Sequence, residues 1–177
     1  MEKFAFIIHP LSIHDMAHVS PVLKFIPDSW LESALKLKKP FQVSHITGIR
    51  SPYAEAEGWF IGCPLTSKQM VELPEEFVMD RIIESGKIAQ ELGAKVVGLG
   101  AFTSIVGDAG ITVAKNLDIA VTSGNSYTVA TALEGTREAV RLMGKDLATA
   151  HVTIVGASGS IGAACTRILA REANDIT

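Results

Sequence analysis

The sequence predicts an α/β protein with a mostly parallel sheet, followed by the start of a second α/β unit. Three observations predict this class. Short, wholly apolar runs of strand length alternate with amphipathic segments of helix length. Proline and acidic residues mark the starts of these helices, and glycine marks their ends. Finally, three glycines at a spacing of three residues follow the last apolar run, at positions 156–162.

The composition is that of a folded globular protein. Of its 177 residues, 47% are hydrophobic and 20% are charged, so the chain can bury a sizeable core. The formal net charge is −3 and no long basic run occurs, which argues against a nucleic-acid-binding surface. No apolar run approaches the roughly 18 residues that a membrane helix needs, and no signal cleavage site follows the N-terminal one. We therefore expect a cytoplasmic protein with no nucleic-acid partner and no membrane span.

The first part of the chain predicts strands that flank two helices. Phe4–Ile8 is a β-branched and aromatic run that ends at His9-Pro10, which indicates a buried strand. Ser12 can cap a helix that runs to about Lys24, and a second helix follows Pro27 and ends before Pro40. The segments 41–49 and 57–65 are two further strands, which form either a hairpin or neighbouring strands.

The middle of the chain alternates helices and strands with short links. A helix begins at Pro74-Glu75-Glu76 and ends at Gly93, because proline tolerates the first turn and the acids complement the helix dipole. Further elements follow in order: a strand at 94–99, a helix at 108–116, a strand at 119–122 and a helix at 125–143. This order predicts βαβ connections and a three-layer N-terminal α/β domain over residues 1–145, linker helix included.

The segment 150–177 predicts the first strand and helix of a Rossmann domain. Gly156 permits a sharp exit from the strand 152–155, Gly159 lets the backbone approach a pyrophosphate, and Gly162 lets the helix pack closely. Backbone N–H groups at the start of the helix would then hold the anion. A plain strand–turn–helix packing motif is the alternative interpretation. The residue that distinguishes NAD from NADP would lie at or beyond Thr177, so the motif itself leaves both cofactors open.

Two further loops are candidate ligand sites because they follow predicted parallel strands. They span Gly98–Gly107 and Thr122–Thr128, and both combine glycines with small hydroxyl or amide side chains. Open α/β sheets bind their ligands at the carboxyl ends of such strands. The alternative role is helix capping, by Thr103 or Ser104 in the first loop and by Ser123 or Asn125 in the second.

The histidines and cysteines predict no metal site and no nucleophile. His9, His14 and His18 are spaced by five and four residues, and the last two would share one face of a helix. The sequence identifies neither a third ligand for them nor a second shell, so we expect no metal. Cys63 follows a glycine in an apolar strand with no neighbouring base, which favours a buried structural thiol. Cys165 lies on the helix after the glycine-rich turn and is expected in the core.

Several segments together resemble one family of reductases. They are similar in sequence and order to the cyanobacterial long-chain acyl-(acyl-carrier-protein) reductases and their bacterial relatives. The resemblance covers nearly the whole chain, and its segments are 4–12, 58–65, 100–105, 122–128 and 152–167.

The resemblance implies a fold, a reaction and a set of contacts. Members combine an N-terminal α/β domain with an NADPH-binding Rossmann domain, broadly like shikimate dehydrogenase, and reduce a fatty acyl thioester to an aldehyde through a cysteine thioester and hydride transfer. The cofactor contacts it implies are Gly156, Ser158, Gly159, Ser160, Ile161 and Gly162, and the residues facing the substrate cleft are Thr103, Ser104 and Asn125. The family's nucleophilic cysteine lies downstream of the glycine-rich turn, and neither cysteine of this chain matches it. Catalytic residues are therefore unknown.

The sequence thus favours the N-terminal part of an NADP-dependent oxidoreductase, inactive by itself, that reduces an acyl thioester to an aldehyde. The acyl group on an acyl carrier protein is one candidate partner, and NAD stays open as the cofactor. One alternative is a shikimate- or amino-acid-dehydrogenase-like enzyme acting on a small acid, which would need a lysine–aspartate pair in the cleft. Another is a non-catalytic binding or assembly module. A single strand and helix leaves an open edge and apolar surface, so we also expect self-association or docking of this unit onto the chain's own sheet.

Overall fold

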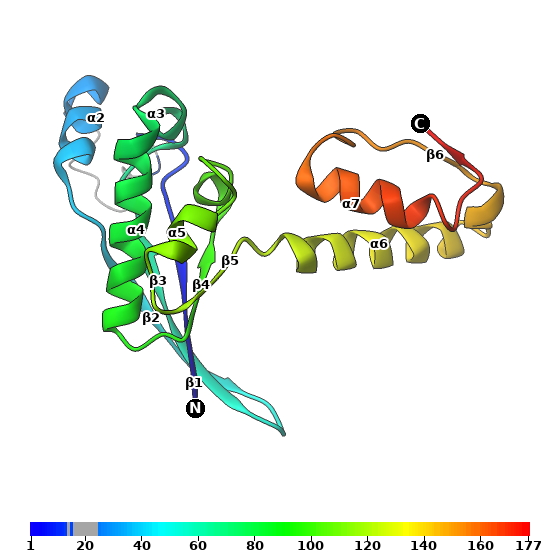
Figure 1. Cartoon of the computed structure of the whole chain (residues 1–177), viewed down its shortest axis with the longest axis horizontal. Coiled ribbons are helices and arrows are strands. Elements are labelled where there is room, and N and C mark those ends of the chain that lie inside the picture. Colours follow the sequence, from blue (N-terminus) through cyan, green and yellow to red (C-terminus); the bar gives the residue numbers. More distant parts are fainter. Residues whose placement is uncertain (14, 16–24) are drawn as a thin grey trace. The chain divides into compact units, whose positions relative to one another are not determined.

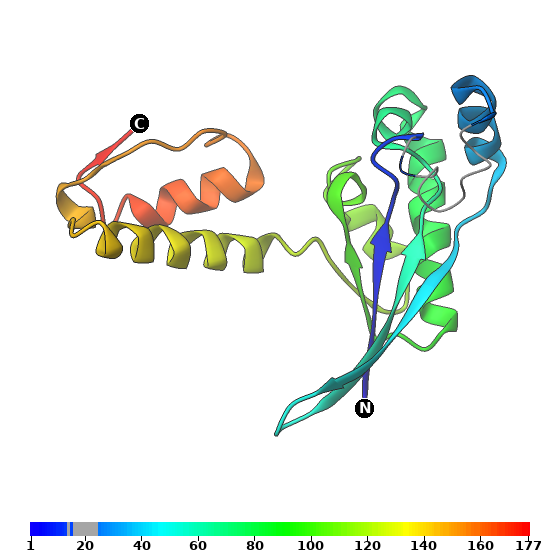
Figure 2. The same cartoon turned by 180° about the vertical axis from the view of Figure 1, so that it is seen from behind.

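A computed structural model describes residues 1–13, 15 and 25–177 of the chain (Figures 1 and 2). The chain divides into two compact units, Met1–Ser123 and Gly124–Thr177. The helix predicted from Ser12 to Lys24 lies mostly outside the described residues.

A five-stranded sheet forms the centre of the first unit. Its order is β2-β3-β1-β4-β5, in which β2 runs antiparallel to β3 and the other strands are parallel. The strands are β1 (Glu2–Ile8), β2 (Phe41–Arg50), β3 (Glu55–Gly62), β4 (Val96–Leu99) and β5 (Ala120–Thr122). The predicted α/β class and the mostly parallel sheet are confirmed. Strands β2 and β3, for which the sequence allowed either a hairpin or neighbouring strands, form a hairpin, and the register of β2 shifts at two places.

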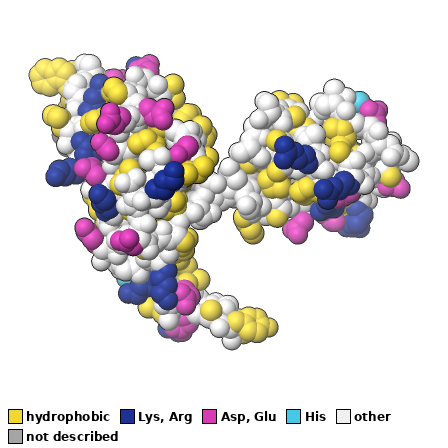
Figure 3. Space-filling view, viewed as in Figure 1, with side chains coloured by type: hydrophobic (Ala, Val, Ile, Leu, Met, Phe, Trp, Pro, Cys, Tyr) yellow, Lys and Arg dark blue, Asp and Glu magenta, His cyan; other side chains and the backbone are white. Residues whose placement is uncertain are grey.

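Helices cover one face of this sheet. They are α4 (Glu75–Glu91), which packs on β1, β2 and β3, and α5 (Ile111–Lys115), which packs on β5. Helix α3 (Ser67–Glu72) packs on α4, the 3-10 helix η2 (Ala101–Ser104) follows β4, and α2 (Asp28–Leu37) precedes β2. On α4, Val78 and Ile82 lie on one side and are fully buried against Ile7 of β1 and Ile61 of β3. This stripe is what the 3.6-residue period of the segment predicts. The surface seen from the helix side carries acidic and basic side chains mixed together (Figure 3).

The other face of the sheet is apolar, and no described helix of the first unit covers it (Figure 2). Aromatic rings lie on glycines of the neighbouring strand there: a Cβ on Gly58 would meet the ring of Phe4 at 2.6 Å, and one on Gly98 would meet the ring of Phe6 at 2.5 Å. Phe6 is 40% exposed. Of the three layers that the sequence predicts for this domain, the described part of the first unit supplies the sheet and one helical layer.

The second unit is a helix pair with two short parallel strands. Its elements are α6 (Asn125–Leu142), the 3-10 helix η3 (Leu147–Thr149), β6 (His151–Val152), α7 (Ser160–Leu169) and β7 (Asp175–Ile176). Leu133 of α6 and Leu169 of α7 form the centre of its apolar cluster, together with Cys165, which lies in the core as predicted. Besides the expected strand and helix, this segment contains a second short strand, β7. Helix α6 groups with the glycine-rich segment, whereas the sequence places the boundary between residues 145 and 150.

Helices α6 and α7 run parallel and in register. At their first residues, Asn125 Nδ2 contacts Ser160 Oγ, and further along Arg137 binds both carboxylate oxygens of Glu172. Both contacts join residues 35 positions apart in the sequence. The two helix N-termini therefore lie at the same end of this unit (Figure 1).

Among the described helices, none combines the length and the hydropathy that crossing a membrane requires.

Candidate functional sites

The order of the strands creates a topological switch point at the carboxyl ends of β1 and β4. These strands are neighbours, but the chain leaves β1 toward the β3 side of the sheet and leaves β4 toward β5. The loops after the two strands therefore diverge, and such a crevice is the usual ligand site of open α/β sheets. His9 follows β1 there, and the segment 100–104 follows β4.

His9 connects the two loops through Nε2, and its Nδ1 contacts its own loop. Its Nε2 accepts a hydrogen bond of 3.2 Å from the backbone N–H of Phe102, and its Nδ1 lies 3.0 Å from the carbonyl oxygen of Pro10. Because Nε2 accepts, the proton resides on Nδ1 and donates to Pro10. Burial lowers the pKa of His9 below its ordinary value, which favours this neutral form.

The loop after β4 is tightly constrained. A Cβ on Gly100 would lie 2.6 Å from the carbonyl oxygen of Ile7, so the close approach requires glycine. Ala101 adopts a left-handed φ of 46°, which is costly for a residue with a side chain. The hydroxyl of Thr103, which is 1% exposed, donates to the Gly100 carbonyl at 2.8 Å, and that of Ser104 donates to the Ala101 carbonyl at 2.7 Å. Thr103 and Ser104, the two predicted substrate residues of this loop, thus use their hydroxyl protons within the loop.

Cys63 has the environment of a structural thiol. It is fully buried at the end of β3, and burial raises its pKa to about 11. A thiol with such a pKa is almost entirely protonated near neutral pH and is a poor nucleophile. No cluster of metal-ligating side chains occurs within the described ranges, and His14 and His18 lie outside them.

The glycine-rich turn of the second unit requires two of its glycines by geometry. Gly156 has a left-handed φ of 85°. A Cβ on Gly162 would lie 2.1 Å from the carbonyl oxygen of Gly156, which is impossible without moving the backbone. Gly159, the N-cap of α7, leaves ordinary room for a Cβ, which would lie 3.4 Å from the same oxygen. The first N–H groups of α7, at Ser160, Ile161 and Gly162, have no acceptor within the helix.

Asn125 and Ser160, which the sequence assigned to different ligands, are hydrogen-bonded to each other. The Asn125 Nδ2 donates to Ser160 Oγ at 3.0 Å. The N-cap of α6 is Gly124, and no side chain caps this helix, so neither Ser123 nor Asn125 has the capping role. Ser158 is exposed in the turn. A sequence reading cannot find the Asn125–Ser160 pair, because it depends on how two helices pack.

The electrostatic setting of this end of the second unit suits an anion. Neither α6 nor α7 has an acidic residue in its first turn, and the segment 152–170 contains none at all. Helix α4, in contrast, begins with Glu75 and Glu76, whose negative charges neutralise the positive end of its own dipole. The groove lined by those acids, Asp80 and Asp108 would repel a phosphate.

Comparison with curated proteins shows a distant similarity to an enzyme. No protein-family profile matches the chain. The chain is 29% identical over 179 residues to the aminotransferase PigE of Serratia sp. (strain ATCC 39006), an alignment that covers 94% of the chain and 20% of that protein. The chain thus spans about a fifth of the length of the curated relative that it matches, and it is similar to part of an enzyme.

Proposed function

We propose that this chain is part of an NADP-dependent oxidoreductase that reduces an acyl thioester to an aldehyde, and that the turn 156–162 holds the pyrophosphate of the cofactor. The observation that supports this most is the backbone of the turn itself. Gly156 and Gly162 are required by a left-handed φ and by a 2.1 Å approach, and the turn leads directly into the N-terminus of α7. This is the backbone arrangement that pyrophosphate-binding turns use.

Each residue of the turn has a physical task in this proposal. The N–H groups of Ser160, Ile161 and Gly162 would donate to phosphate oxygens, and Ser158 would add a hydroxyl donor. Gly159 carries no side chain on the approach to the turn. When bound, NADPH would supply the hydride for reduction of the thioester carbonyl carbon; together with one proton, cleavage of the C–S bond would give an aldehyde and a thiol.

The first unit would supply the substrate side of the enzyme. His9 and the loop 100–104 form a rigid wall at the switch point, because both ring nitrogens of His9 and both hydroxyls of the loop are already hydrogen-bonded. We assign Thr103 to shaping this loop through its buried hydrogen bond. Ser104, which is less buried, keeps its proposed substrate contact.

The similarity to an aminotransferase is compatible with this reaction. Transamination as a class converts a carbonyl compound into an amine, and an aldehyde is such a carbonyl compound. The chain is similar to only a fifth of that protein, and no lysine is buried in the part of the chain that the structure describes.

The alternative of a small-acid dehydrogenase has weaker support. A lysine–aspartate pair would be expected at the carboxyl ends of the strands. Lys3 lies at the opposite end of β1, where it pairs with Glu57. Among the described residues around the switch point, the loops 9–11 and 100–104 contain neither lysine nor aspartate.

One substitution separates nucleotide binding from stability. Gly159→Asp places a favoured capping side chain at the N-cap of α7, and its backbone angles of −76° and 164° suit such a cap. The same carboxylate would stand beside the proposed pyrophosphate and repel it. We expect this variant to unfold at a temperature equal to or above that of wild type, while its binding of ADP-ribose and NADPH, measured by nuclear magnetic resonance titration, is lost.

Gly159→Ser is the matched control, because serine also caps the helix but carries no charge. It should keep most of the binding. If wild type shows no shifts of the 156–162 amides with ADP-ribose or NADPH, or if Gly159→Asp binds as wild type does, the proposed cofactor site is wrong. The reduction itself is tested with the full natural gene product, by following NADPH oxidation with acyl-coenzyme A and acyl-(acyl-carrier-protein) substrates.

A further inference from the structure

We propose that Asn125, at the start of α6, is a positioning residue of the pyrophosphate site, because it fixes the hydroxyl of Ser160 so that its proton is directed to a phosphate oxygen. This inference rests on the proposed function of the turn 156–162. It adds a residue from another helix, 35 positions away, to that site.

The hydrogen bond between Asn125 and Ser160 has a fixed direction. The amide nitrogen of Asn125 has only protons to offer, so the Ser160 oxygen accepts in this 3.0 Å contact. The hydroxyl proton of Ser160 must therefore point to another partner, and no acceptor for it occurs among the described residues. A hydroxyl that already accepts one hydrogen bond is also a better donor, because hydrogen bonds in a chain polarise one another.

The second step is that helix packing does not depend on this contact. Leu133, Cys165 and Leu169 form an apolar cluster between α6 and α7, and Arg137 binds both carboxylate oxygens of Glu172. Asn125 is half-buried and is not part of this apolar cluster. Its side chain also does not cap its own helix, although asparagine is well suited to capping.

The third step concerns charge. Helices α6 and α7 are parallel, their N-termini share one end of the unit, and neither has an acid in its first turn. The Asn125–Ser160 pair therefore lies where two positive helix ends add together. A doubly charged pyrophosphate is the ligand class that this arrangement would hold, and the Ser160 hydroxyl would donate to it.

The test is a double-mutant cycle on the purified chain. The probes are NADP and inorganic pyrophosphate, titrated to millimolar concentration while the amide resonances of 156–162 are followed by nuclear magnetic resonance. We expect Asn125→Ala and Ser160→Ala each to weaken binding by roughly tenfold, as for the loss of a charge-assisted hydrogen bond. The double variant should be no weaker than Ser160→Ala alone, because Asn125 acts only through Ser160.

Two further variants make the outcome specific. Asn125→Asp should weaken binding more than Asn125→Ala, because its carboxylate accepts the Ser160 proton and repels phosphate. Thr131→Ala, which removes an exposed hydroxyl bonded only to the backbone of α6, should bind as wild type does. Thermal unfolding of all variants should stay within a few degrees of wild type.

The possible failures are distinguishable. If Ser160→Ala weakens binding and Asn125→Ala does not, the role of Asn125 is wrong and the pyrophosphate site stands. The role of Asn125 is also wrong if the two single effects multiply in the double variant. If wild type shows no shift with either probe, the proposed function itself is overturned, and the role of Asn125 is overturned with it.

Discussion

Two glycines of the second unit differ in what a methyl group would meet. At Gly162 a Cβ would lie 2.1 Å from the carbonyl oxygen of Gly156, whereas at Gly135, in the middle of α6, nothing lies within 4 Å. Gly162 is thus required by the close approach of the turn to the helix. Gly135 only adds flexibility to the unfolded chain and lowers the helix propensity of α6.

The two glycines therefore predict opposite effects of the same substitution. Gly162→Ala should destabilise the chain by about 1–3 kcal/mol, the usual range for overpacking, because the backbone of the turn must move. Gly135→Ala should stabilise it by about 0.5–1 kcal/mol. Urea unfolding followed by circular dichroism measures both, and a neutral Gly162→Ala would show that the turn is looser than the structure describes.

His9 predicts a pH dependence of stability. Burial lowers its pKa in the folded chain below the ordinary value of 6.5. As the pH falls below about 6.5, the unfolded chain takes up a proton on His9 before the folded chain does, so the free energy of unfolding decreases. Above that pH both states are neutral at His9, and its contribution is constant.

The matched variant is His9→Gln, whose side-chain oxygen can still accept from the Phe102 N–H but does not titrate in this range. Denaturant unfolding at a series of pH values between 5 and 8 should show a shallower slope below pH 6.5 for this variant. Equal slopes would mean that His9 titrates alike in the folded and unfolded chains.

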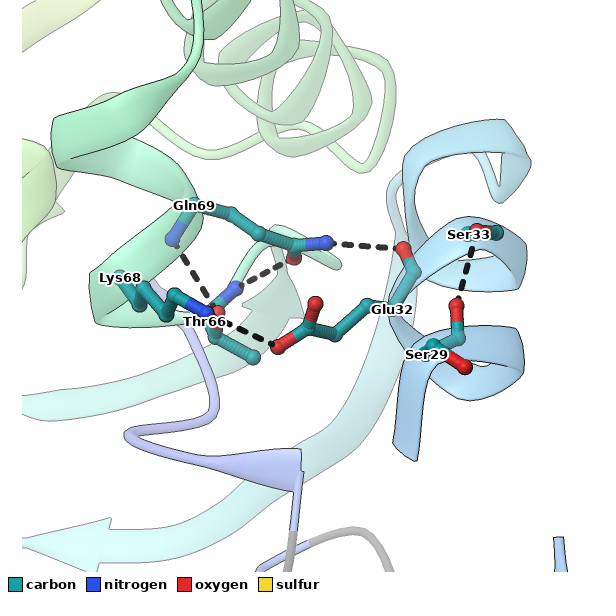
Figure 4. A network of polar contacts seen from close by, with 6 residues as sticks. All are labelled: Ser29, Glu32, Ser33, Thr66, Lys68 and Gln69. Atoms are coloured by element: carbon teal, nitrogen blue, oxygen red, sulfur yellow. Dashed lines mark hydrogen bonds and ion pairs between the residues drawn. The ribbon is translucent and has the colours of Figure 1, made fainter. Parts of the chain in front are cut away.

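At the scale of elements, the short helix α3 depends on one capping box (Figure 4). The Thr66 hydroxyl accepts from the backbone N–H of Gln69 at 3.2 Å, and the Gln69 side-chain oxygen accepts from the backbone N–H of Thr66 at 3.0 Å. The Gln69 amide also donates to the carbonyl oxygen of Glu32 at 2.8 Å, which ties α2 to α3. Gln69 is only 4% exposed, so these groups have little access to water.

We expect Thr66→Ala to cost about 1 kcal/mol, as for other lost caps. Gln69→Leu should cost more, because it leaves the buried backbone N–H of Thr66 without a partner, at roughly 1–3 kcal/mol, and also removes the hydrogen bond to the Glu32 carbonyl of α2. Ser33→Ala, on the exposed side of α2 in the same view, should change stability by less than about 0.5 kcal/mol. Thermal unfolding gives the order, and an equal loss for Ser33→Ala would show that the capping box has no special weight.

How far the sequence predicts an element depends on whether its signals are local. Helix α4 starts and ends close to the predicted positions, because Pro74-Glu75-Glu76 and Gly93 act within one turn. Helix α3 was missed because six residues are too few to show a period, although the pattern from Thr66 to Gln69 is a capping-box signature. The pairing of β2 with β3 stayed open because it is set by contacts across the sheet.

The same distinction holds for the candidate sites. The turn 156–162 was predicted because left-handed φ and close approach are needs of the local backbone that only glycine meets. The Asn125–Ser160 contact and the His9–Phe102 contact join residues 35 and 93 positions apart, so they follow from packing alone. A histidine directly after the first predicted parallel strand was nevertheless a usable signal for the second contact.

At the scale of the whole molecule, the division after Ser123 shows what a sequence leaves undecided. The sequence of α6 predicts an apolar stripe along the helix, but this pattern does not identify the element on which the stripe packs. In the structure, Val129 and Leu133 pack with residues of α7, so α6 belongs to the second unit. The sheet face that no described helix of the first unit covers raises the same question of a partner, since parallel sheets are normally covered on both faces.

That face predicts self-association of the purified chain, and two exposed positions on β2 test it. Val43 lies over Gly62 and is 48% exposed, and Ile49, paired with Ala56, is 43% exposed. Lysines at both positions would place two charges on the apolar face at its edge strand, a feature that natural sheets use against association. We expect the double variant Val43→Lys/Ile49→Lys to keep the unfolding temperature within a few degrees, to bind less of a hydrophobic fluorescent dye, and to scatter light as a smaller species.

Val71→Lys on α3, 69% exposed and away from this face, adds one of these charges elsewhere and should leave both dye binding and size unchanged. If Val71→Lys reduces association as much as the double variant, net charge and not the sheet face controls it.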